Sequence, residues 1–192
     1  LDVRSLSADL VERDLSKHVE KQLVTSLGDL PRLRHFYGRS TELENMVNLL
    51  EARSTTLMVP GIAGIGKTSM AAKVIESFMH RRNLMYHRCQ DWEGSRAFLE
   101  SIADWLSNIG DSMLADYISA TPVPKSGDAA RIIVDSLSNS PALIVIDDYH
   151  KVNDKTLHKT IQAISRGLVE SEGDVGLVIF SRSFKEVVPL KD

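Results

Sequence analysis

Residues 56–68 read Thr-Leu-Met-Val-Pro-Gly-Ile-Ala-Gly-Ile-Gly-Lys-Thr, and this stretch decides the fold expected of the chain. It fits the pattern G-x-x-x-x-G-K-[ST] in full, from Gly61 to Thr68. A short apolar run at 57–59 precedes the glycines, and apolar residues recur at helical spacing after them, from Met70 to Phe78. We therefore expect the stretch to join a buried strand to the start of a helix.

The glycines of this stretch suit it to holding a phosphate group against bare backbone. Gly61, Gly64 and Gly66 have no Cβ and can adopt positive φ angles. Their N–H groups can then face an anion beside the positive end of the following helix. We expect Lys67 to reach the β- and γ-phosphates and Thr68 to offer its hydroxyl to Mg²⁺. The predicted nucleotide-binding residues of the loop are Gly61, Ile62, Ala63, Gly64, Ile65, Gly66, Lys67, Thr68 and Ser69.

Composition limits the classes of protein to which the chain can belong. Its 192 residues allow one α/β domain with a small additional segment. A net charge of −3 and a pI of about 6.1 give no global positive field for nucleic acid, although they are compatible with a local basic patch. The single cysteine, Cys89, excludes an internal disulfide framework and fits a reducing compartment. Apolar runs stay well below the roughly 18 residues of a membrane span and no secretory signal opens the chain, so we expect a cytoplasmic protein without membrane contact.

Two parts are predicted along the chain: an N-terminal helix and linker over 1–34, and a nucleotide-binding core over 35–192. In the first part, apolar residues recur at helical spacing over 7–27, and Gly28 can end that helix. The helix either packs on the surface of the core or links it to a preceding domain. Because the sequence begins at Leu1 and ends shortly after a strand, we expect the core to be cut from a longer chain.

The core is predicted to alternate strands and helices. Apolar runs predict strands at about 55–60, 84–90, 142–148 and 175–180. Helical periodicity predicts helices after about residue 40 and over about 67–82, 95–109, 112–119, 129–137 and 155–170. The run 142–146 is apolar throughout, as expected of a parallel strand covered on both faces. The alternation therefore predicts an α/β fold in three layers, with a parallel sheet between helices.

Acidic residues end the most apolar of the predicted strands. Asp147 and Asp148 follow its last isoleucine, at the carboxyl edge where ligands of parallel sheets gather. We expect Asp147 to hold Mg²⁺ through its water shell. Asp148 is predicted to orient or deprotonate an attacking water, the alternative being that it caps a turn.

Arg182 follows the last predicted strand at the same edge. A guanidinium there could face a γ-phosphate, where it would stabilise developing charge, or a neighbouring subunit. The alternative is a solvated arginine at the end of a strand. We interpret Arg182 as a catalytic candidate beside Lys67 and Asp148.

Several other residues carry weaker signals. His87 and Cys89 alternate on one predicted strand, but two ligands do not make a metal site. His150 is interpreted as a turn residue, with γ-phosphate sensing as the alternative. Trp92 and Trp105 are expected to be core or core-edge aromatics.

Four segments together resemble the STAND-type P-loop ATPases, the signal-transduction branch of the ASCE class. The chain is similar to their archaeal and bacterial members and, more distantly, to the NB-ARC domains of apoptotic and plant immune proteins. The segments follow the order of the family and cover about residues 35–183. They are Phe36-Tyr37-Gly38-Arg39 with Glu42-Leu43, Gly61–Thr68, Leu143–Asp148 and Ile179-Phe180-Ser181-Arg182.

The resemblance implies more than the spacing shows. It implies strand order 5-1-4-3-2, with Asp147 on strand 3 and Arg182 after strand 4, and we expect the fifth strand to be missing from this chain. It also implies that Phe36, Tyr37, Gly38 and Arg39 lie beside an adenine base. In such proteins ATP and ADP control a switch, with self-association in the ATP form and with winged-helix and repeat domains in the same chain. Because the segments that follow the core in such proteins are not part of this sequence, we expect weak nucleotide binding and slow hydrolysis of ATP.

Two other functions stay open at this stage. One is an AAA+ ATPase acting on DNA, similar to origin-recognition ATPases. Those usually have Asp-Glu where this chain has Asp147-Asp148, and the acidic pI also argues against nucleic acid as a partner of this domain. The other is a scaffold that nucleotide stabilises without turnover, for which Lys67, Thr68 and Asp147 would serve equally well.

Overall fold

The computed structural model describes residues 23–33, 36–52 and 54–183 and shows an alternation of strands and helices. The strands and helices predicted for the core over 35–192 are all present, with bounds that differ by a few residues. In chain order the elements are β1 Thr25–Ser26, α2 Ser40–Ala52, β2 Thr55–Pro60, α3 Lys67–Phe78, β3 Asn83–Arg88, α4 Ser95–Ile109, α5 Met113–Ala120, α6 Ser126–Leu137, β4 Ala142–Asp147, the 3-10 helix η1 Tyr149–Lys151, α7 Lys155–Glu170 and β5 Val175–Ser181. None of the helices within the described ranges is long and apolar enough to cross a lipid bilayer.

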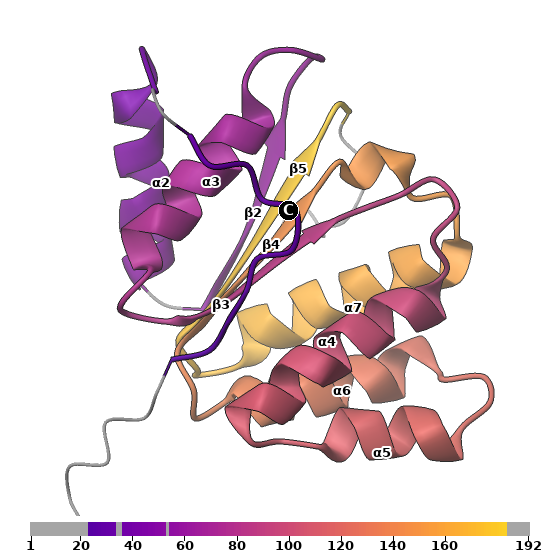
Figure 1. Cartoon of the computed structure of the whole chain (residues 1–192). Coiled ribbons are helices and arrows are strands. Elements are labelled where there is room, and N and C mark those ends of the chain that lie inside the picture. Colours follow the sequence, from indigo (N-terminus) through magenta and orange to yellow (C-terminus); the bar gives the residue numbers. More distant parts are fainter. Residues whose placement is uncertain (1–22, 34–35, 53, 184–192) are drawn as a thin grey trace, which may run out of the picture.

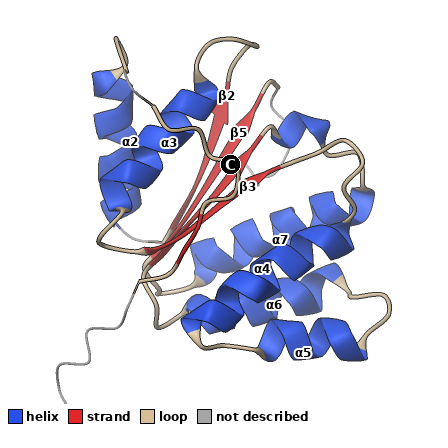
Figure 2. Ribbon diagram, in the orientation of Figure 1, coloured by secondary structure: helices blue, strands red, loops and turns tan. Residues whose placement is uncertain are grey.

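All five strands pair in parallel, in the order β1-β3-β4-β5-β2 (Figure 2). The four strands predicted from the sequence therefore lie in the expected order, with β2 as strand 1, β3 as strand 2, β4 as strand 3 and β5 as strand 4. Parallel neighbours need crossover connections, and the intervening helices supply them. The α/β fold with a parallel sheet is confirmed.

Helices cover both faces of the sheet (Figure 1). Helices α2 and α3 pack on one face, and α4, α6 and α7 pack on the other, with α5 against α4 and α6. The side chains of β4 alternate between these two layers: Ala142, Ile144 and Ile146 join the larger cluster, and Leu143 and Val145 join the smaller one. Every residue of β4 is buried, which explains why its sequence is apolar without a break before Asp147.

The sheet has an additional strand at the edge beside β3, whereas the fifth strand of the resemblance, expected to be missing from this chain, would lie beside β2. The predicted helix over 7–27 falls largely outside the described residues, but its last part, Thr25–Ser26, is strand β1 beside β3. The N–H group of Val24 donates to Asn83 Oδ1 at 2.9 Å, and the N–H group of Leu84 donates to the Val24 carbonyl at 2.8 Å. This segment forms a strand and not the predicted helix because the backbone N–H and C=O groups of β3 need hydrogen-bond partners.

Helix α3 ends at Phe78, about four residues earlier than predicted. The N–H groups of Arg81 and Arg82 both donate to the Phe78 carbonyl, at 3.0 and 3.2 Å, and turn the chain into β3. The Arg82 guanidinium then lies over the Phe78 ring, donates to the Leu50 carbonyl at 2.7 Å and pairs with Asp174. This buried arginine joins the ends of α2, α3 and the loop before β5.

A glycine in β5 provides a test of the packing between α2 and the sheet. A Cβ added at Gly176 would lie 2.8 Å from a Leu50 methyl and 2.9 Å from a Leu143 methyl. We expect Gly176→Ala to lower the free energy of unfolding by about 1–3 kcal/mol through overpacking. The same exchange at Gly127, where a Cβ meets nothing within 4 Å, should change stability by less than about 1 kcal/mol, and in the opposite direction. Denaturant unfolding of both variants measures the difference, and equal effects would contradict the packing shown here.

Candidate functional site

The loop between β2 and α3 has the backbone conformation that its glycines suggest at two of three positions. Gly64 and Gly66 have positive φ angles, of 78° and 89°. Gly61 does not; there the requirement is space, because a Cβ would lie 3.0 Å from the Ile65 Cγ2 atom. The N–H group of Gly61 donates to the Ser181 carbonyl at 3.0 Å, which ties the loop to the end of β5.

Lys67 begins α3 and folds over the loop. Its Nζ donates to the carbonyls of Gly61 at 2.6 Å and Ile62 at 2.9 Å, and the residue is only 8% exposed. A pocket of about 230 Å³ opens beside it, above the first turn of α3 where backbone N–H groups have no helical partner. The lining residues are Ala63, Gly64, Gly66, Lys67, Thr68, Ser69, Asp148 and Arg182.

Asp147 lies below this pocket, with its carboxylate held from three sides. Thr68 Oγ1 donates to Oδ2 at 2.6 Å, and the Tyr86 hydroxyl donates to the same oxygen at 3.1 Å. The N–H group of Asp148 donates to Oδ1 at 2.7 Å. Asp147 is completely buried, so these bonds replace the water that the carboxylate loses. The structure thus brings together the two residues predicted to hold Mg²⁺.

Tyr86 was not found from the sequence. It stands on β3 opposite Val145 in the register, and its side chain is on the same face as Asp147. Burial and the charge of Asp147 raise the pKa of the Tyr86 hydroxyl, so that it keeps its proton and stays a donor. Only the adjacency of β3 and β4 reveals this partner, because nothing in the local sequence of Tyr86 distinguishes it from a core residue.

Asp148 lines the pocket and forms ion pairs with two cations. Its φ of 55° is the one positive value among the described non-glycine residues. Oδ2 lies 3.0 Å from Arg88 Nε and 3.0 Å from Lys151 Nζ. Partial burial alone would raise the pKa of this carboxyl, but the hydrogen bonds and charges of Lys151 and Arg88 outweigh it and lower the pKa. Sequence reasoning missed both cations, although Lys151 is only three residues away.

Arg182 follows β5 and lines the pocket together with Asp148 and Lys67. Its positive charge reaches His150 in η1, where burial first and Arg182 second lower the pKa of the imidazole. The 3-10 turn of His150 agrees with its interpretation as a turn residue. Lys67 and Arg182 therefore bring two positive charges to the pocket, and Asp148 brings one negative charge. The net positive charge favours an anion.

The segment 36–39 lies beside the glycine loop. Arg39 Nη1 donates to the Ile65 carbonyl at 3.2 Å, and the chain turns at Gly38, whose φ is 71°. Phe36 packs against the core layer of α2 and α3, whereas Tyr37 is 82% exposed. Of the four residues predicted to lie beside an adenine, the structure thus brings Arg39 into direct contact with the loop.

The two tryptophans differ in burial. Trp105 is buried in α4 with 1% exposure, as predicted. Trp92 is 79% exposed in the turn between β3 and α4, so its prediction as a core or core-edge aromatic is wrong. The turn carries it outward because Glu93, its neighbour, occupies the buried position.

Comparison of the fold with solved structures finds similar ATPases. A STAND protein with a tetratricopeptide repeat sensor from Pyrococcus horikoshii superposes with a TM-score of 0.63 and 24% sequence identity over 85% of this chain. The chain has the fold of the P-loop ATPases. The resemblance read from the sequence is thereby confirmed at the level of the fold, while this chain covers only 23% of that protein.

Two further structures share this P-loop ATPase fold. The Drosophila ORC, solved bound to DNA, matches 93% of this chain at 13% identity with a TM-score of 0.51. Cdc6p from Pyrobaculum aerophilum matches 82% of this chain at 19% identity with a TM-score of 0.50. The chain covers 52% and 42% of their lengths. No family model matches the chain, and no curated protein does so.

The ion pairs of Asp148 predict how the thermal stability of the protein depends on pH. A folded-state pKa below the usual value means that the charged carboxylate adds stability above the unfolded pKa of about 4, and that this stability is lost as the pH falls through the folded pKa. We expect Asp148→Asn to lower the melting temperature at pH 7 and to approach the wild type below about pH 4. Thermal melts of both proteins across this range measure it, with Asp104→Asn, at an exposed position on α4, as the matched control. If the difference in melting temperature between the wild type and Asp148→Asn increased as the pH fell, the ion pairs of Asp148 would be contradicted.

Proposed function

We propose that this domain binds ATP and ADP with Mg²⁺ and hydrolyses ATP slowly as a regulatory nucleotide switch. The observation that carries the proposal is the 2.6 Å hydrogen bond between Thr68 and Asp147 beneath the glycine loop. A hydroxyl and a carboxylate are hard oxygen ligands, and Mg²⁺ is usually held by one or two such groups together with the phosphates of its substrate. The residues present therefore fit the cation.

In this proposal the chain holds the nucleotide through three groups of residues. The N–H groups of the loop and the first turn of α3 bind phosphate oxygens. Lys67 Nζ, a three-proton donor that uses two protons on loop carbonyls, turns its charge toward the β- and γ-phosphates. When bound, Mg²⁺ neutralises part of the charge on these phosphates. Thr68 and Asp147 would be the residues that hold it.

Turnover would depend on Asp148 and Arg182. Asp148 would orient the attacking water and accept its proton, and Arg182 would stabilise charge on the γ-phosphate. The ion pairs of Asp148 with Arg88 and Lys151 keep its pKa low, which makes it a weak base and supports slow turnover. A slow hydrolase keeps each nucleotide long enough for its two forms to serve as signals.

The segment 36–39 is proposed to recognise the adenine base. The contact of Arg39 with the Ile65 carbonyl supports this, since it holds the segment at the side of the phosphate loop. Tyr37 and Ile62 are 82% and 71% exposed near this contact, an apolar rim that a further domain or a second copy would cover.

We also propose that winged-helix and repeat domains belong to the same chain and that the protein self-associates in a nucleotide-dependent way. The proposed location is cytoplasmic, with no role for membrane or nucleic acid through this domain.

Replacement of Lys67 tests nucleotide binding. Lys67→Ala removes a charged donor, and we expect the affinity for a fluorescent ADP analogue to fall about 10- to 100-fold. Lys73→Ala is the matched control on the same helix, where the lysine pairs with Glu76 at the surface, and it should bind like the wild type. A wild-type domain that binds neither ADP nor ATP would overturn the proposal.

A second experiment separates the switch from the two alternatives. We expect wild-type protein to release phosphate from ATP, and Asp148→Asn to release it at least about tenfold more slowly while its ADP affinity changes little. Nucleotide binding without phosphate release, unchanged by Asp148→Asn, would favour a scaffold. Hydrolysis that duplex DNA stimulates in a salt-dependent way would favour the DNA-linked ATPase.

A further inference from the structure

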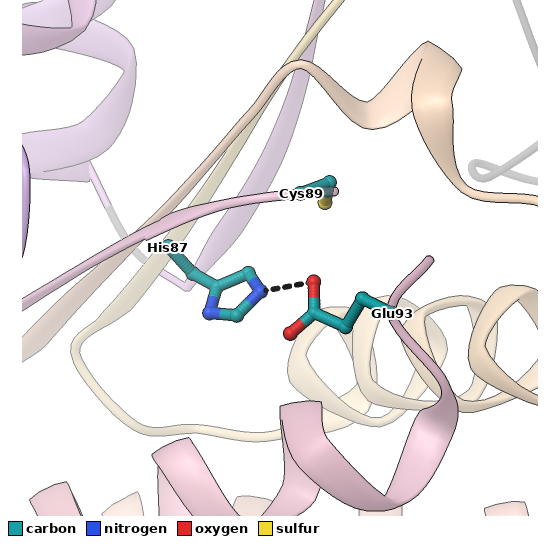
Figure 3. Close-up of side chains that lie close together, drawn as sticks. All are labelled: His87, Cys89 and Glu93. Carbon is teal, nitrogen blue, oxygen red and sulfur yellow. Dashed lines mark hydrogen bonds and ion pairs between the residues drawn. The ribbon is translucent and has the colours of Figure 1, made fainter. Parts of the chain in front are cut away.

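Three potential metal ligands converge on the sheet face opposite to the nucleotide site. His87 lies on β3, Cys89 follows its last residue, and Glu93 belongs to the turn before α4 (Figure 3). His87 Nε2 and Glu93 Oε2 are 3.0 Å apart, and all three ligand atoms lie within 4.8 Å of one another. No other such group of three occurs among the residues that the structure describes.

Alternation along β3 produces this separation. Successive side chains of a strand point to opposite faces, so Tyr86 and Arg88 serve Asp147 and Asp148, whereas His87 and Cys89 face the layer of α4. The sequence showed only the pair His87-x-Cys89. The third ligand, Glu93, reaches the pair because the turn to α4 folds back under the end of the strand.

The three side chains are held in place by their surroundings. The His87 ring packs edge-on against Phe98, with centroids 5.0 Å apart and an interplanar angle of 87°. Cys89 is completely buried and Glu93 is 8% exposed. The N–H group of Gln90 also approaches Glu93 Oε2, at 3.4 Å. Such support orients potential ligands before an ion arrives.

The ligand set selects a transition metal over Mg²⁺. Zinc binds imidazole nitrogen, thiolate sulfur and carboxylate oxygen at about 2.0–2.3 Å, so ligand atoms in a tetrahedral site are separated by roughly 3.5 Å. The ligand atoms of His87 and Glu93, 3.0 Å apart, would have to separate by about 0.5 Å, and the thiol, within 4.8 Å of them, would have to approach by about 1 Å. Three protein ligands leave one coordination position for water.

We propose that His87, Cys89 and Glu93 form a zinc site at the end of β3, independent of the nucleotide site. On binding, bonds form from Zn²⁺ to Nε2, Sγ and a carboxylate oxygen, and the Cys89 thiol gives its proton to solvent. The ion would fix the turn before α4 to the carboxyl end of β3. Because the N–H group of Cys89 donates to the Asp147 carbonyl at 2.9 Å, this fastening lies one hydrogen bond from the nucleotide site.

Cobalt titration tests the site directly. Cys89 is the only cysteine in the chain, so a thiolate-to-cobalt charge-transfer band can arise only there. We expect the untagged 192-residue chain with excess Mg²⁺ to develop this band with one equivalent of Co²⁺, and Zn²⁺ to abolish it by displacement. A wild-type titration without the band would overturn the proposal.

Variants that keep the fold make the test specific. Cys89→Ser should lose the band, and Glu93→Gln, which can keep the hydrogen bond to His87, should weaken Co²⁺ binding more than tenfold, since loss of even an outer partner costs 10- to 100-fold. His80→Gln, at an exposed position, is the matched control and should titrate like the wild type. Circular dichroism checks that each variant is folded. Unchanged affinity in folded Glu93→Gln would overturn the three-ligand site.

Discussion

The hydrogen bond from Thr68 to Asp147 spans 79 residues of sequence and depends on the rest of the structure. Asp147 is completely buried, and a carboxylate without partners in such a place would be strongly destabilising. Thr68, Tyr86 and the N–H group of Asp148 supply those partners from α3, β3 and the chain after β4. Thr68 is one of these partners and, together with Asp147, would also hold a hydrated cation, so the stability of the fold and the proposed function both require this contact.

The neighbouring aspartate faces a different environment. Asp148 lies at the pocket, with a positive φ and with Arg88 and Lys151 on its carboxylate. Arg88 also lies 3.7 Å from Asp29, in the segment that follows β1. A chain of charges therefore runs from the N-terminal edge of the sheet to the pocket. Any movement of that edge that withdraws Arg88 would leave Asp148 with one cation fewer and with a higher pKa. This is a physical route by which other parts of the protein could act on the hydrolysis proposed above.

The sheet separates two kinds of chemistry by the simplest rule of strand geometry. Even-numbered positions of β3 supply Tyr86 and Arg88 to the aspartates, and odd-numbered positions place His87 and the following Cys89 in the layer of α4. Oxygen ligands collect on the first side and a mixed nitrogen, sulfur and oxygen set on the second. Hard and borderline cations would thus find different ligands on opposite faces of one strand.

The sequence by itself determined the loop at 61–68, the apolar run of β4 with Asp147 at its end, and the alternation that implies a parallel sheet. These features are local, because glycine spacing, apolar periodicity and the burial of a strand on both faces can each be recognised within about ten residues of sequence. The resemblance added the order of the four strands predicted for the core. Only the tertiary structure decided that Thr25–Ser26 forms a strand, that Trp92 points outward, and that Tyr86, Arg88 and Glu93 complete the two sites. Each of these depends on a partner distant in the sequence or on which way a turn folds, and neither is encoded in the identity of the residue itself.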